Sequence, residues 1–314
     1  MQTTKESEFF KELGITFDKV IGEGGYGVLY LVYHEQYKSY FAMKKIPEKR
    51  FNQAEIDCLK NIDHPNIVSL YKYYFFNGFV YLLMEYCPVD LSMILQKQSE
   101  LDEEILRRYV HDILLAIQAC HDRCIAHSDI KPSNFLIDKY GRIKVCDFGF
   151  SDVYENCSCQ MFCGTLLFIA PEVLKKQEYN PMKADIWALG VTIYYMATKQ
   201  FPFYATNQKA LLDIIEQEKY CLRNVENPLL RQIIARCLEK DPSKRAECSE
   251  LLDMPYFDSF KQTSPPIKKK IGISTSAFAL NYNLTTKFSN LKIERNTLNP
   301  SKMRILRPVI HNKL

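Results

Sequence analysis

Residues 127–134 of this chain read His-Ser-Asp-Ile-Lys-Pro-Ser-Asn, and residues 147–149 read Asp-Phe-Gly. Two short apolar runs lie between them, Phe-Leu-Ile at 135–137 and Ile-Lys-Val at 143–145, and both predict short strands. An imidazole, two carboxylates, an ammonium group and an amide are thus gathered around one predicted pair of strands.

The chain before residue 86 has the pattern of a β-rich region. Short aromatic and β-branched runs recur from Phe17 to Glu85, which predicts strands at 28–33, 40–43, 71–76 and 79–84. The last two runs are separated by Asn77-Gly78, a strong signal for a two-residue hairpin. One helix is predicted among these strands, around residues 51–60.

After Cys87-Pro88 the pattern turns helical. Apolar residues recur at helical spacing from residue 105 to residue 117, and Asp102 is a suitable N-cap for this helix. Further helical patterns occupy residues 182–198, 209–216, 228–238 and 248–254. A small β-rich lobe therefore precedes a larger helical lobe, with the switch near 86–88, and the cleft between two such lobes is the natural ligand site.

The segment Gly22-Glu-Gly-Gly-Tyr-Gly27 has the spacing G-x-G-x-x-G. In a dinucleotide-binding fold such a loop opens a helix, but here residues 28–33 favour a strand, so the glycines lie in a strand-turn-strand hairpin. This is the arrangement in which backbone amides close over the phosphates of ATP. The glycines alone do not separate that loop from a plain glycine-rich turn.

Taken together, these motifs resemble those of eukaryotic protein kinases over roughly residues 15–257. The resemblance covers the glycine loop, a strand lysine at Lys44, a helix glutamate at Glu55, a catalytic loop of the form H-x-D-x-K-x-x-N and the Asp-Phe-Gly triplet. It continues with Ala-Pro-Glu at 170–172, with Asp185, Trp187 and Gly190, and with Arg245 after Asp241-Pro242. It implies an α+β, two-lobed kinase-like fold, with an N-lobe at 15–86 and a C-lobe at 88–257.

The resemblance also implies roles in phosphoryl transfer, with ATP and Mg²⁺ as cofactors. Asp129 would accept or orient the proton of the substrate hydroxyl, and Lys131 would reach the transferred phosphate. Asn134 and Asp147 would hold Mg²⁺, which prefers oxygen ligands. Lys44 would contact the α- and β-phosphates and pair with Glu55. Lys45 points to the opposite face of the strand, so only one of the two lysines can enter the cleft.

The set of nucleotide-binding positions that the resemblance implies is larger. It comprises Ile21, Gly22, Glu23, Gly24, Gly25, Tyr26, Gly27, Val28, Leu29, Ala42, Lys44, Glu55, Met84, Glu85, Cys87 and Asp90. Within it, Ile21, Leu29 and Ala42 would sandwich the adenine, and Met84 would guard the back of its pocket. Backbone groups of Glu85 and Cys87 would pair with the adenine edge, and Asp90 would lie near the ribose. Glu172 with Arg245 would form a buried structural ion pair.

Lys131, two residues after the catalytic aspartate, and Thr165, before the Ala-Pro-Glu triplet, are typical of Ser/Thr kinases. The overall look is nearest to the calcium/calmodulin-dependent and AMP-activated kinase group. The expected partners are ATP and protein substrates phosphorylated on Ser or Thr, with no nucleic acid. One rival function is a pseudokinase scaffold with this fold and no turnover. The other is a dinucleotide-binding oxidoreductase, which the strand after the glycine loop disfavours.

Two departures from the kinase pattern lead to hypotheses. Ser128 stands where these kinases usually have an arginine that pairs with a phosphate on the activation loop, so we expect loop order without that phosphate. Ser133 and Tyr195 stand where kinases that prefer arginine near the target have acids. We therefore expect no strong preference for Arg two residues before the target, and only a modest preference for a basic residue three before, near Asp90.

Composition places the chain among ordinary globular proteins, with 47% hydrophobic and 25% charged residues in 314. The longest uncharged apolar run, residues 186–198, is too short to span a membrane. Eleven cysteines without a disulfide-framework spacing predict reduced thiols in the cytosol or the nucleus. Cys157, Cys159 and Cys163 are expected in an exposed loop, as ordinary cysteines, a redox switch or a metal site, with the first reading favoured.

The two ends of the chain lie outside the predicted domain. Residues 1–14 are expected to form an N-terminal extension. Residues 258–314 carry 11 basic and 2 acidic residues, a net charge of +9, against −5 for the rest of the chain. This basic tail, which contains three consecutive lysines at 268–270, is predicted to be either a solvated extension without fixed structure or a segment for docking or nuclear import.

Overall fold

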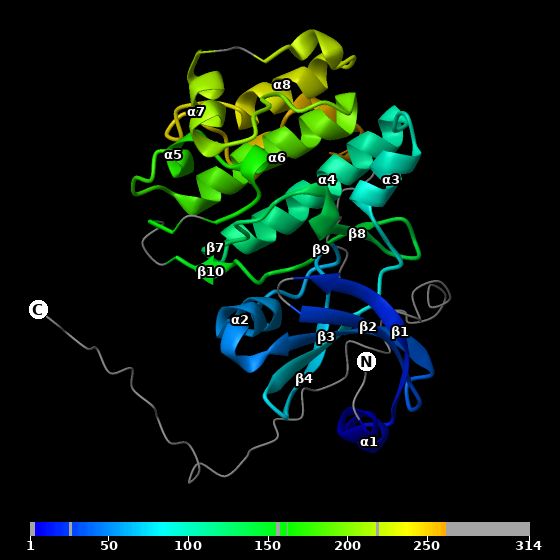
Figure 1. Ribbon diagram of the computed structural model, residues 1–314. Helices are drawn as coiled ribbons and strands as arrows, with labels where there is room; N and C mark the ends of the chain where they lie inside the picture. Colours follow the sequence, from blue (N-terminus) through cyan, green and yellow to red (C-terminus); the bar gives the residue numbers. More distant parts are fainter. Residues whose placement is uncertain (1–3, 25–26, 155–157, 162, 218–219, 262–314) are drawn as a thin grey trace, which may run out of the picture. The chain divides into compact units, whose positions relative to one another are not determined.

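Five antiparallel strands form the sheet of the N-terminal lobe, in the order β1-β2-β3-β5-β4. Their bounds are β1 Ile15–Gly24, β2 Gly27–His34, β3 Ser39–Pro47, β4 Leu70–Phe76 and β5 Phe79–Glu85. The computed structural model describes residues 4–24, 27–154, 158–161, 163–217 and 220–261. Lys44 lies opposite Leu29 of β2 and Leu82 of β5, so strand β3 is hydrogen-bonded on both sides. Figure 1 shows this sheet and the helices that follow it.

The predicted local signals of this lobe are confirmed. Strands β4 and β5 meet at Asn77 and Gly78, whose φ angles of 49° and 77° are the positive values that a tight hairpin turn of this kind needs. Helix α2, Gln53–Asn61, starts after a 3₁₀ turn at Glu48–Arg50, and the Asn52 side chain accepts a hydrogen bond from the backbone N–H of Ala54. The pattern predicts this helix two residues too early.

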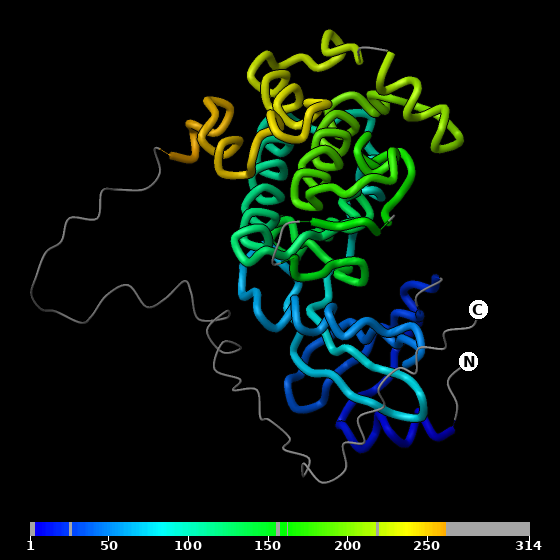
Figure 2. The backbone as a smooth tube through the Cα atoms, turned by 90° about the vertical axis from the view of Figure 1, so that its left-hand side faces the viewer, coloured from blue at the N-terminus to red at the C-terminus, as the bar shows by residue number. Residues whose placement is uncertain are grey.

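An N-terminal helix, α1 Thr4–Glu12, precedes the sheet. The sequence predicts only an extension at residues 1–14, without assigning its structure. In Figures 1 and 2 the helix lies beneath the sheet, away from the C-terminal helices. Phe10 belongs to a buried cluster on this face of the sheet, with Tyr30, Met43 and Tyr81 among its members.

The C-terminal lobe is built around two long helices, α4 Glu103–His121 and α6 Pro181–Thr198. The Asp102 side chain caps α4 by accepting from the backbone of Glu104 and Ile105, as its sequence predicts. The other helices are α3 Leu91–Lys97, α5 Pro171–Leu174, α7 Gln208–Gln217, α8 Pro228–Cys237, α9 Cys248–Leu252 and α10 Asp258–Lys261. Helices α6 to α9 fall within two residues of their predicted bounds, whereas α3 has no predicted counterpart.

Five short strands form two further sheets, with the orders β6-β8-β9 and β10-β7. They are β6 Val89–Asp90, β7 Ile125–Ala126, β8 Phe135–Ile137, β9 Ile143–Val145 and β10 Asp152–Val153. Strands β8 and β9 are both present as predicted, and their antiparallel pairing brings the residues before β8 next to those after β9. The catalytic-loop stretch and the Asp-Phe-Gly triplet therefore meet at one end of this small sheet.

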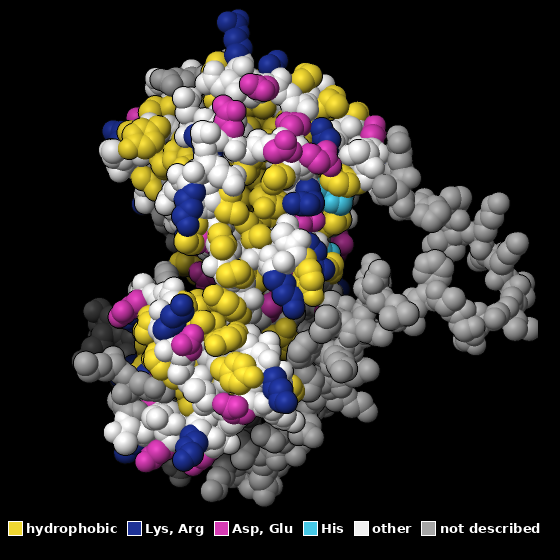
Figure 3. Space-filling view, turned by 90° about the vertical axis from the view of Figure 1, so that its right-hand side faces the viewer, with side chains coloured by type: hydrophobic (Ala, Val, Ile, Leu, Met, Phe, Trp, Pro, Cys, Tyr) yellow, Lys and Arg dark blue, Asp and Glu magenta, His cyan; other side chains and the backbone are white. Residues whose placement is uncertain are grey.

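Helices α6 and α8 of the C-terminal lobe are closely packed. Gly190 of α6 lies against α8, where a Cβ atom would be 2.6 Å from Cys237 Cβ. On the face shown in Figure 3, acidic and basic side chains are interspersed with hydrophobic ones. Among the described residues, none of the helices has both the length and the apolar character needed to cross a membrane.

Candidate active site

Lys44 is the point at which three distant segments meet. Its Nζ lies 2.7 Å from Glu55 Oε1 on helix α2 and 2.8 Å from Asp147 Oδ1, just after strand β9. Glu55 is almost fully buried, and 16% of the Lys44 side chain is exposed. The ion pair between Lys44 and Glu55 that the resemblance implies is thus present, and Asp147 joins it.

The charges of this group alter one another's ionisation. Burial alone would lower the pKa of Lys44, but the carboxylates of Glu55 and Asp147 raise it above its ordinary value. Burial opposes ionisation of Asp147, yet the Lys44 ammonium holds its pKa below the ordinary range. Burial raises the pKa of Glu55 despite the same ammonium. The raised pKa keeps Lys44 in its charged form at neutral pH, the form that can pair with an anion.

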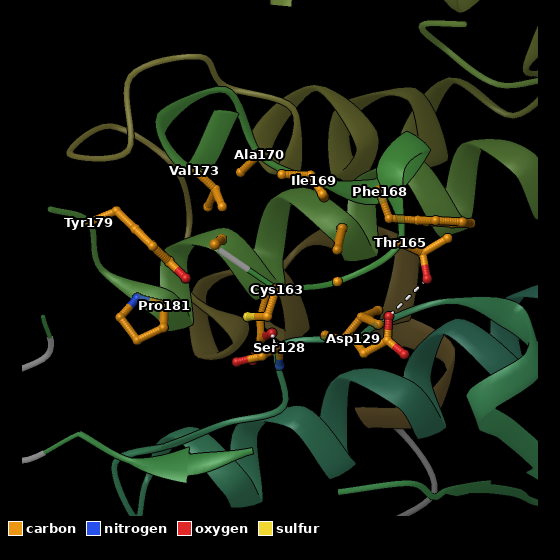
Figure 4. Close-up of a pocket in the computed structure, with 15 residues that line it drawn as sticks. Ser128, Asp129, Cys163, Thr165, Phe168, Ile169, Ala170, Val173, Tyr179 and Pro181 are labelled. Atoms are coloured by element: carbon orange, nitrogen blue, oxygen red, sulfur yellow. Dashed lines mark hydrogen bonds between the residues drawn. The ribbon is translucent and has the colours of Figure 1, made fainter. Parts of the chain in front are cut away.

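Asp129 occupies the centre of a second hydrogen-bonded group. Its Oδ1 accepts the Thr165 hydroxyl at 3.0 Å, and its Oδ2 lies 2.8 Å from the Lys131 ammonium. Lys131 also donates to Thr165 Oγ1 at 2.9 Å, which closes a triangle of three side chains. Figure 4 shows Thr165 pointing at Asp129 from the segment above it. The hydrogen bond from Thr165 therefore helps to orient the Asp129 carboxylate.

Asn134 connects Asp129 to the place where a cation could bind. Its amide nitrogen donates to the Asp129 carbonyl at 2.8 Å and to Asp129 Oδ2 at 3.1 Å. Both donors of this amide are therefore engaged, which leaves the amide oxygen as the atom able to accept a cation. Among the described residues, no three His, Cys, Asp or Glu side chains group to hold a metal by themselves. Two oxygen ligands from Asn134 and Asp147 suit Mg²⁺, which usually shares its site with phosphates and water.

Asp185 of helix α6 fixes the backbone of the catalytic loop. Its carboxylate accepts the backbone N–H groups of His127 at 2.7 Å and Ser128 at 2.9 Å, and it also bonds the His121 ring. The His127 ring bonds the carbonyl of Cys146, the residue before Asp147, at 2.9 Å. Ser128 and Asp147 both have positive φ, 66° and 63°, a conformation that non-glycine residues keep only when surrounding bonds impose it.

The glycine loop is a β-hairpin, as predicted, and not the start of a helix. Gly24 of β1 pairs with Gly27 of β2, and Gly25 and Tyr26 lie outside the described residues. A Cβ atom on Gly27 would lie 2.1 Å from the carbonyl oxygen of Lys45, so only glycine fits this crossing. Ile21, Gly22 and Val28 are half-buried along the hairpin, whereas Glu23 and Gly24 are exposed.

The positions assigned to adenine lie on one side of the sheet and in the segment after it. Leu29 is directly opposite Lys44, and Ala42, two residues before Lys44, shares its face and lies opposite Met84. The backbone N–H of Glu85 donates to Ser69 O, and its carboxylate pairs with the buried Lys144 at 2.8 Å. Lys144, on β9, belongs to no motif, so sequence reasoning missed it.

Cys87 and Asp90 complete the segment that joins the two lobes. Cys87 is buried, and burial raises the pKa of its thiol to about 12, so it is present as an uncharged group. Asp90 caps helix α3, because its Oδ1 accepts the backbone N–H of Met93 at 2.9 Å and the Ser92 hydroxyl. This structural bond is one that the resemblance did not indicate.

The prediction that the cysteines of the activation segment are exposed is wrong for Cys159 and Cys163. Cys159 is buried, and burial raises the pKa of the half-buried Cys163, so these two thiols do not lie in an exposed loop. Cys157 lies outside the described residues. The reason is Tyr179, whose backbone forms two hydrogen bonds with Cys159, at 2.9 and 3.0 Å, and whose hydroxyl donates to the Met161 carbonyl at 2.8 Å.

Figure 4 shows Ser128, Cys163 and Tyr179 around one cavity, with Thr165 and Asp129 at its other end. The described lining of this cavity contains two acids, Asp129 and Asp185, and no lysine or arginine. The Ser128 hydroxyl is buried there without a hydrogen-bond partner among the described residues. The described lining therefore offers no lysine or arginine to pair with a phosphate.

Glu172 and Arg245 form the buried ion pair expected from the sequence. Arg245 is 1% exposed, and its guanidinium lies 2.6 and 3.0 Å from the two Glu172 oxygens. It also donates to the carbonyls of Lys183 and Glu239. The pair lies at the junction of α5, α6 and the loop before α9, and it takes no part in the group around Asp129.

Comparison with known proteins places this geometry in a family. Residues 15–257 match the protein kinase domain family, and the chain belongs to that family. Sperm motility kinase 3A of Mus musculus is 33% identical over 244 residues, which cover 76% of this chain and 48% of the relative. Probable serine/threonine-protein kinase MARK-A of Dictyostelium discoideum is 32% identical over 254 residues, 78% of this chain and 24% of the relative.

A third relative, the SNF-related serine/threonine-protein kinase of Homo sapiens, is 31% identical over 265 residues, 81% of this chain and 34% of the relative. The chain thus spans less than half the length of these three curated relatives. The similarity to kinases of Ser/Thr type confirms the resemblance found in the motifs. A protein kinase domain implies ATP, typically with Mg²⁺, and protein substrates.

Proposed function

We propose that this chain is an ATP-dependent protein kinase that transfers the γ-phosphate of ATP to Ser or Thr hydroxyls of proteins. The observation that carries the proposal is the convergence of three segments that are distant in sequence: Lys44 Nζ lies 2.7 Å from Glu55 and 2.8 Å from Asp147, beside the Asp129 group. A phosphate-binding cation, an oxygen ligand for Mg²⁺ and a candidate base lie on three separate segments. A purely structural network has no need to gather them at one cleft.

The chemistry follows from what each side chain can do. Asp129, whose carboxylate Thr165 and Lys131 hold in one orientation, accepts or orients the proton of the attacking hydroxyl. Lys131 has an ammonium at the same point and can neutralise charge on the transferred phosphate. Lys44 binds the α- and β-phosphates, and Glu55 keeps its side chain extended toward them. Bound Mg²⁺, held by Asn134 and Asp147, would neutralise charge that develops on the phosphate oxygens.

The decisive experiment measures transfer of radiolabelled phosphate from ATP to a generic protein substrate. We expect the wild-type chain to transfer phosphate and Asp129→Asn to lose about 10² to 10⁴ of the rate. Asp122→Asn, at the exposed end of helix α4, is the matched control and should keep the wild-type rate. Equal rates for wild type and Asp129→Asn would contradict the proposal.

The same experiment tests the rival pseudokinase. A wild-type chain that binds Mg·ATP and transfers no phosphate would be a scaffold with a kinase fold. A thermal-shift comparison of Mg·ATP with NAD separates both from a dinucleotide-binding protein, because only the last gains stability from NAD. We favour the kinase because the groups that transfer requires are all present in the sequence: Lys44, Asp129, Asn134 and Asp147.

We also propose that the activation segment, residues 147–172, needs no phosphate to become ordered. The cavity beside Ser128 has two acids in its described lining and no basic side chain. Ser158, a candidate acceptor, donates a hydrogen bond to Glu178, so a phosphate there would face a carboxylate. Uncharged bonds from Tyr179 to Cys159 and Met161 supply the support instead.

For substrates, we propose no strong preference for Arg two residues before the target. Ser133 is exposed and uncharged, and Tyr195 is occupied in stacking on Phe201, with ring centroids 4.8 Å apart. Asp90, part of whose carboxylate caps helix α3, supports only a modest preference for a basic residue three before the target. A peptide array dominated by Arg at the nearer position would refute this part of the proposal.

A further inference from the structure

Glu6 of helix α1 places one buried carboxylate oxygen among three neighbouring strands. Its Oε1 accepts the Tyr81 hydroxyl of β5 at 2.8 Å, lies 2.8 Å from Lys45 Nζ of β3, and is 3.5 Å from the Tyr30 hydroxyl of β2. Glu6 is 1% exposed. The match to the kinase family begins at residue 15, so this helix lies outside it.

Aromatic packing holds the same helix against the sheet. The Phe9 ring stacks on Phe76 of β4, with centroids 4.2 Å apart and planes 3° from parallel. The Phe10 ring meets Tyr30 and Tyr81 edge to face, at 6.2 and 5.8 Å. Helix α1 thus contacts strands β2, β3, β4 and β5 through side chains, and it continues into β1 through the turn at Gly14.

Lys45 connects this helix to the nucleotide side of the sheet. It follows Lys44 directly in β3, and because side chains alternate along a strand, its ammonium points to Glu6 while that of Lys44 points to Asp147. A Cβ atom on Gly27 would lie only 2.1 Å from the carbonyl oxygen of Lys45. The backbone of Lys45 is therefore in close contact with the last residue of the glycine loop. A shift of Lys45 would therefore also move its neighbour Lys44 and the glycine loop at Gly27.

We propose that Glu6 is a positioning residue for the nucleotide, and that helix α1 acts as a brace that fixes strand β3 and the glycine loop from the opposite face of the sheet. The proposal rests on the proposed function in one respect, that Lys44 and the glycine loop bind ATP. Sequence reasoning gave no hint of it, because Glu6 belongs to no motif.

The physical reason is the cost of a buried, unpaired charge. Only 15% of the Lys45 side chain is exposed, and Glu6 is the one carboxylate within ion-pair distance of it among the described residues. Without the Glu6 carboxylate, the Lys45 ammonium is a buried charge with no ion-pair partner. Lys45 and strand β3 would then shift so that water can solvate the ammonium. Phe79 and Tyr81, whose rings lie 4.3 and 5.7 Å from Lys45 Nζ, would lose their arrangement as well.

The test is the dissociation constant of Mg·ATP, measured by calorimetry on the full chain. Glu6→Gln should bind Mg·ATP about fivefold or more weakly than wild type, the low end of couplings between separate sites. Glu8→Gln, exposed on the same helix, is the matched control and should bind as wild type does. The double variant Glu6→Gln with Lys45→Met removes both charges and should restore the affinity to within about twofold.

A lower melting temperature of Glu6→Gln with an unchanged dissociation constant would overturn the inference, because a purely structural role predicts that result. Hydrogen exchange on the wild-type chain gives a second measurement that needs no variant. Linkage requires Mg·ATP to slow exchange of the amides of α1, and equal exchange with and without nucleotide would also overturn it. Phosphate transfer is measured separately, so a chain that binds Mg·ATP without turnover would sink the proposed function and leave this inference standing on its own readout.

Discussion

At the scale of single residues, Lys44 illustrates how chemistry constrains sequence. Its ammonium is shared by Glu55 and Asp147, and the three pKa values move in the directions expected from burial and mutual charge. The Lys44 ammonium favours the ionised form of Asp147 and so lowers the pKa of this carboxyl despite its burial. The ion pair between Lys44 and Asp147 therefore adds stability while Asp147 is ionised.

A pH dependence follows from the lowered pKa of Asp147. A carboxyl whose pKa is lower in the folded than in the unfolded state adds stability above its unfolded value, ordinarily 3.8, and loses it as the pH falls through the folded value. We expect the stability advantage of wild type over Asp147→Asn to be constant from pH 7 to about pH 4 and to shrink below it. Urea unfolding of both proteins between pH 3 and pH 7 measures this. An advantage that grows toward low pH would contradict it.

Residue types and their order predicted most of this chemistry. The pairing of Lys44 with Glu55 and of Arg245 with Glu172 followed from motif positions alone, and both are present. Glu6 and Lys144 were missed because a buried charge outside a motif leaves no signal in one sequence. Their partners, Lys45 and Glu85, lie 39 and 59 residues away, and only the folded sheet brings them close.

At the scale of elements, neutral contacts hold the described middle part of the activation segment, residues 152–154 and 159–161. Strand β10 pairs with β7, and the Tyr154 N–H donates to the Cys124 carbonyl at 2.8 Å. Further along, the Cys159 thiol donates to the Tyr154 hydroxyl at 3.7 Å and accepts the Met161 N–H at 3.2 Å. Together with the bonds from Tyr179, these contacts support the proposal that the activation segment needs no phosphate to become ordered.

We therefore expect the unphosphorylated protein to be active, and Ser158→Ala and Tyr154→Phe each to keep its activity to within a few-fold. Ser151→Ala is less direct, because the buried Ser151 hydroxyl donates to the His127 carbonyl. Thr165→Ala should be inactive for another reason, the loss of its bond to Asp129. Peptide phosphorylation by phosphatase-treated protein is the measurement. Total loss of activity confined to Ser151, Tyr154 or Ser158 would count against this expectation.

Periodicity located most elements but not their partners. Helices α6 and α8 lie within one residue of the bounds that their helical patterns predict. In both, an asparagine caps the first turn and a proline opens it. Helices α1 and α3 are short, with nine and seven residues, and too few turns to show a stripe. The exposed character expected for Cys159 and Cys163 was wrong, because the backbone of Tyr179, which lies beyond the Ala-Pro-Glu triplet in sequence, pairs with that of Cys159.

At the scale of the whole domain, the buried pair of Glu172 and Arg245 joins the end of the activation segment to the last helices. Removing one member leaves the other as a buried, uncompensated charge, so Glu172→Gln should cost about 3 kcal/mol or more of unfolding free energy. Glu216→Gln removes the half-exposed pair with Lys175 and should cost about 1 kcal/mol or less. Urea unfolding compares the two, and equal losses would contradict the structural role given to Arg245.

The division into a β-rich and a helical lobe was predictable from the change in periodicity near residues 86–88. The sequence does not determine whether the basic tail binds a partner. Residues 262–314 lie outside the described part of the chain. Its composition separates it from the domain, but a run of lysines has the same appearance whether it meets water or a partner. Those two predictions for the tail stay open.

Two adjacent lysines of strand β3 point to opposite faces of the sheet, Lys44 to Asp147 and Lys45 to Glu6. The positions of both therefore depend on the register of this strand. A single inserted or deleted residue between Phe41 and Lys44 would exchange the two faces, placing Lys45 at the carboxylates and Lys44 among the aromatic rings. An insertion or deletion in the turn at residues 35–38 leaves each side chain of β3 on its present face of the sheet. We therefore expect changes of length to be tolerated in this turn and to disrupt the site when they fall between Phe41 and Lys44.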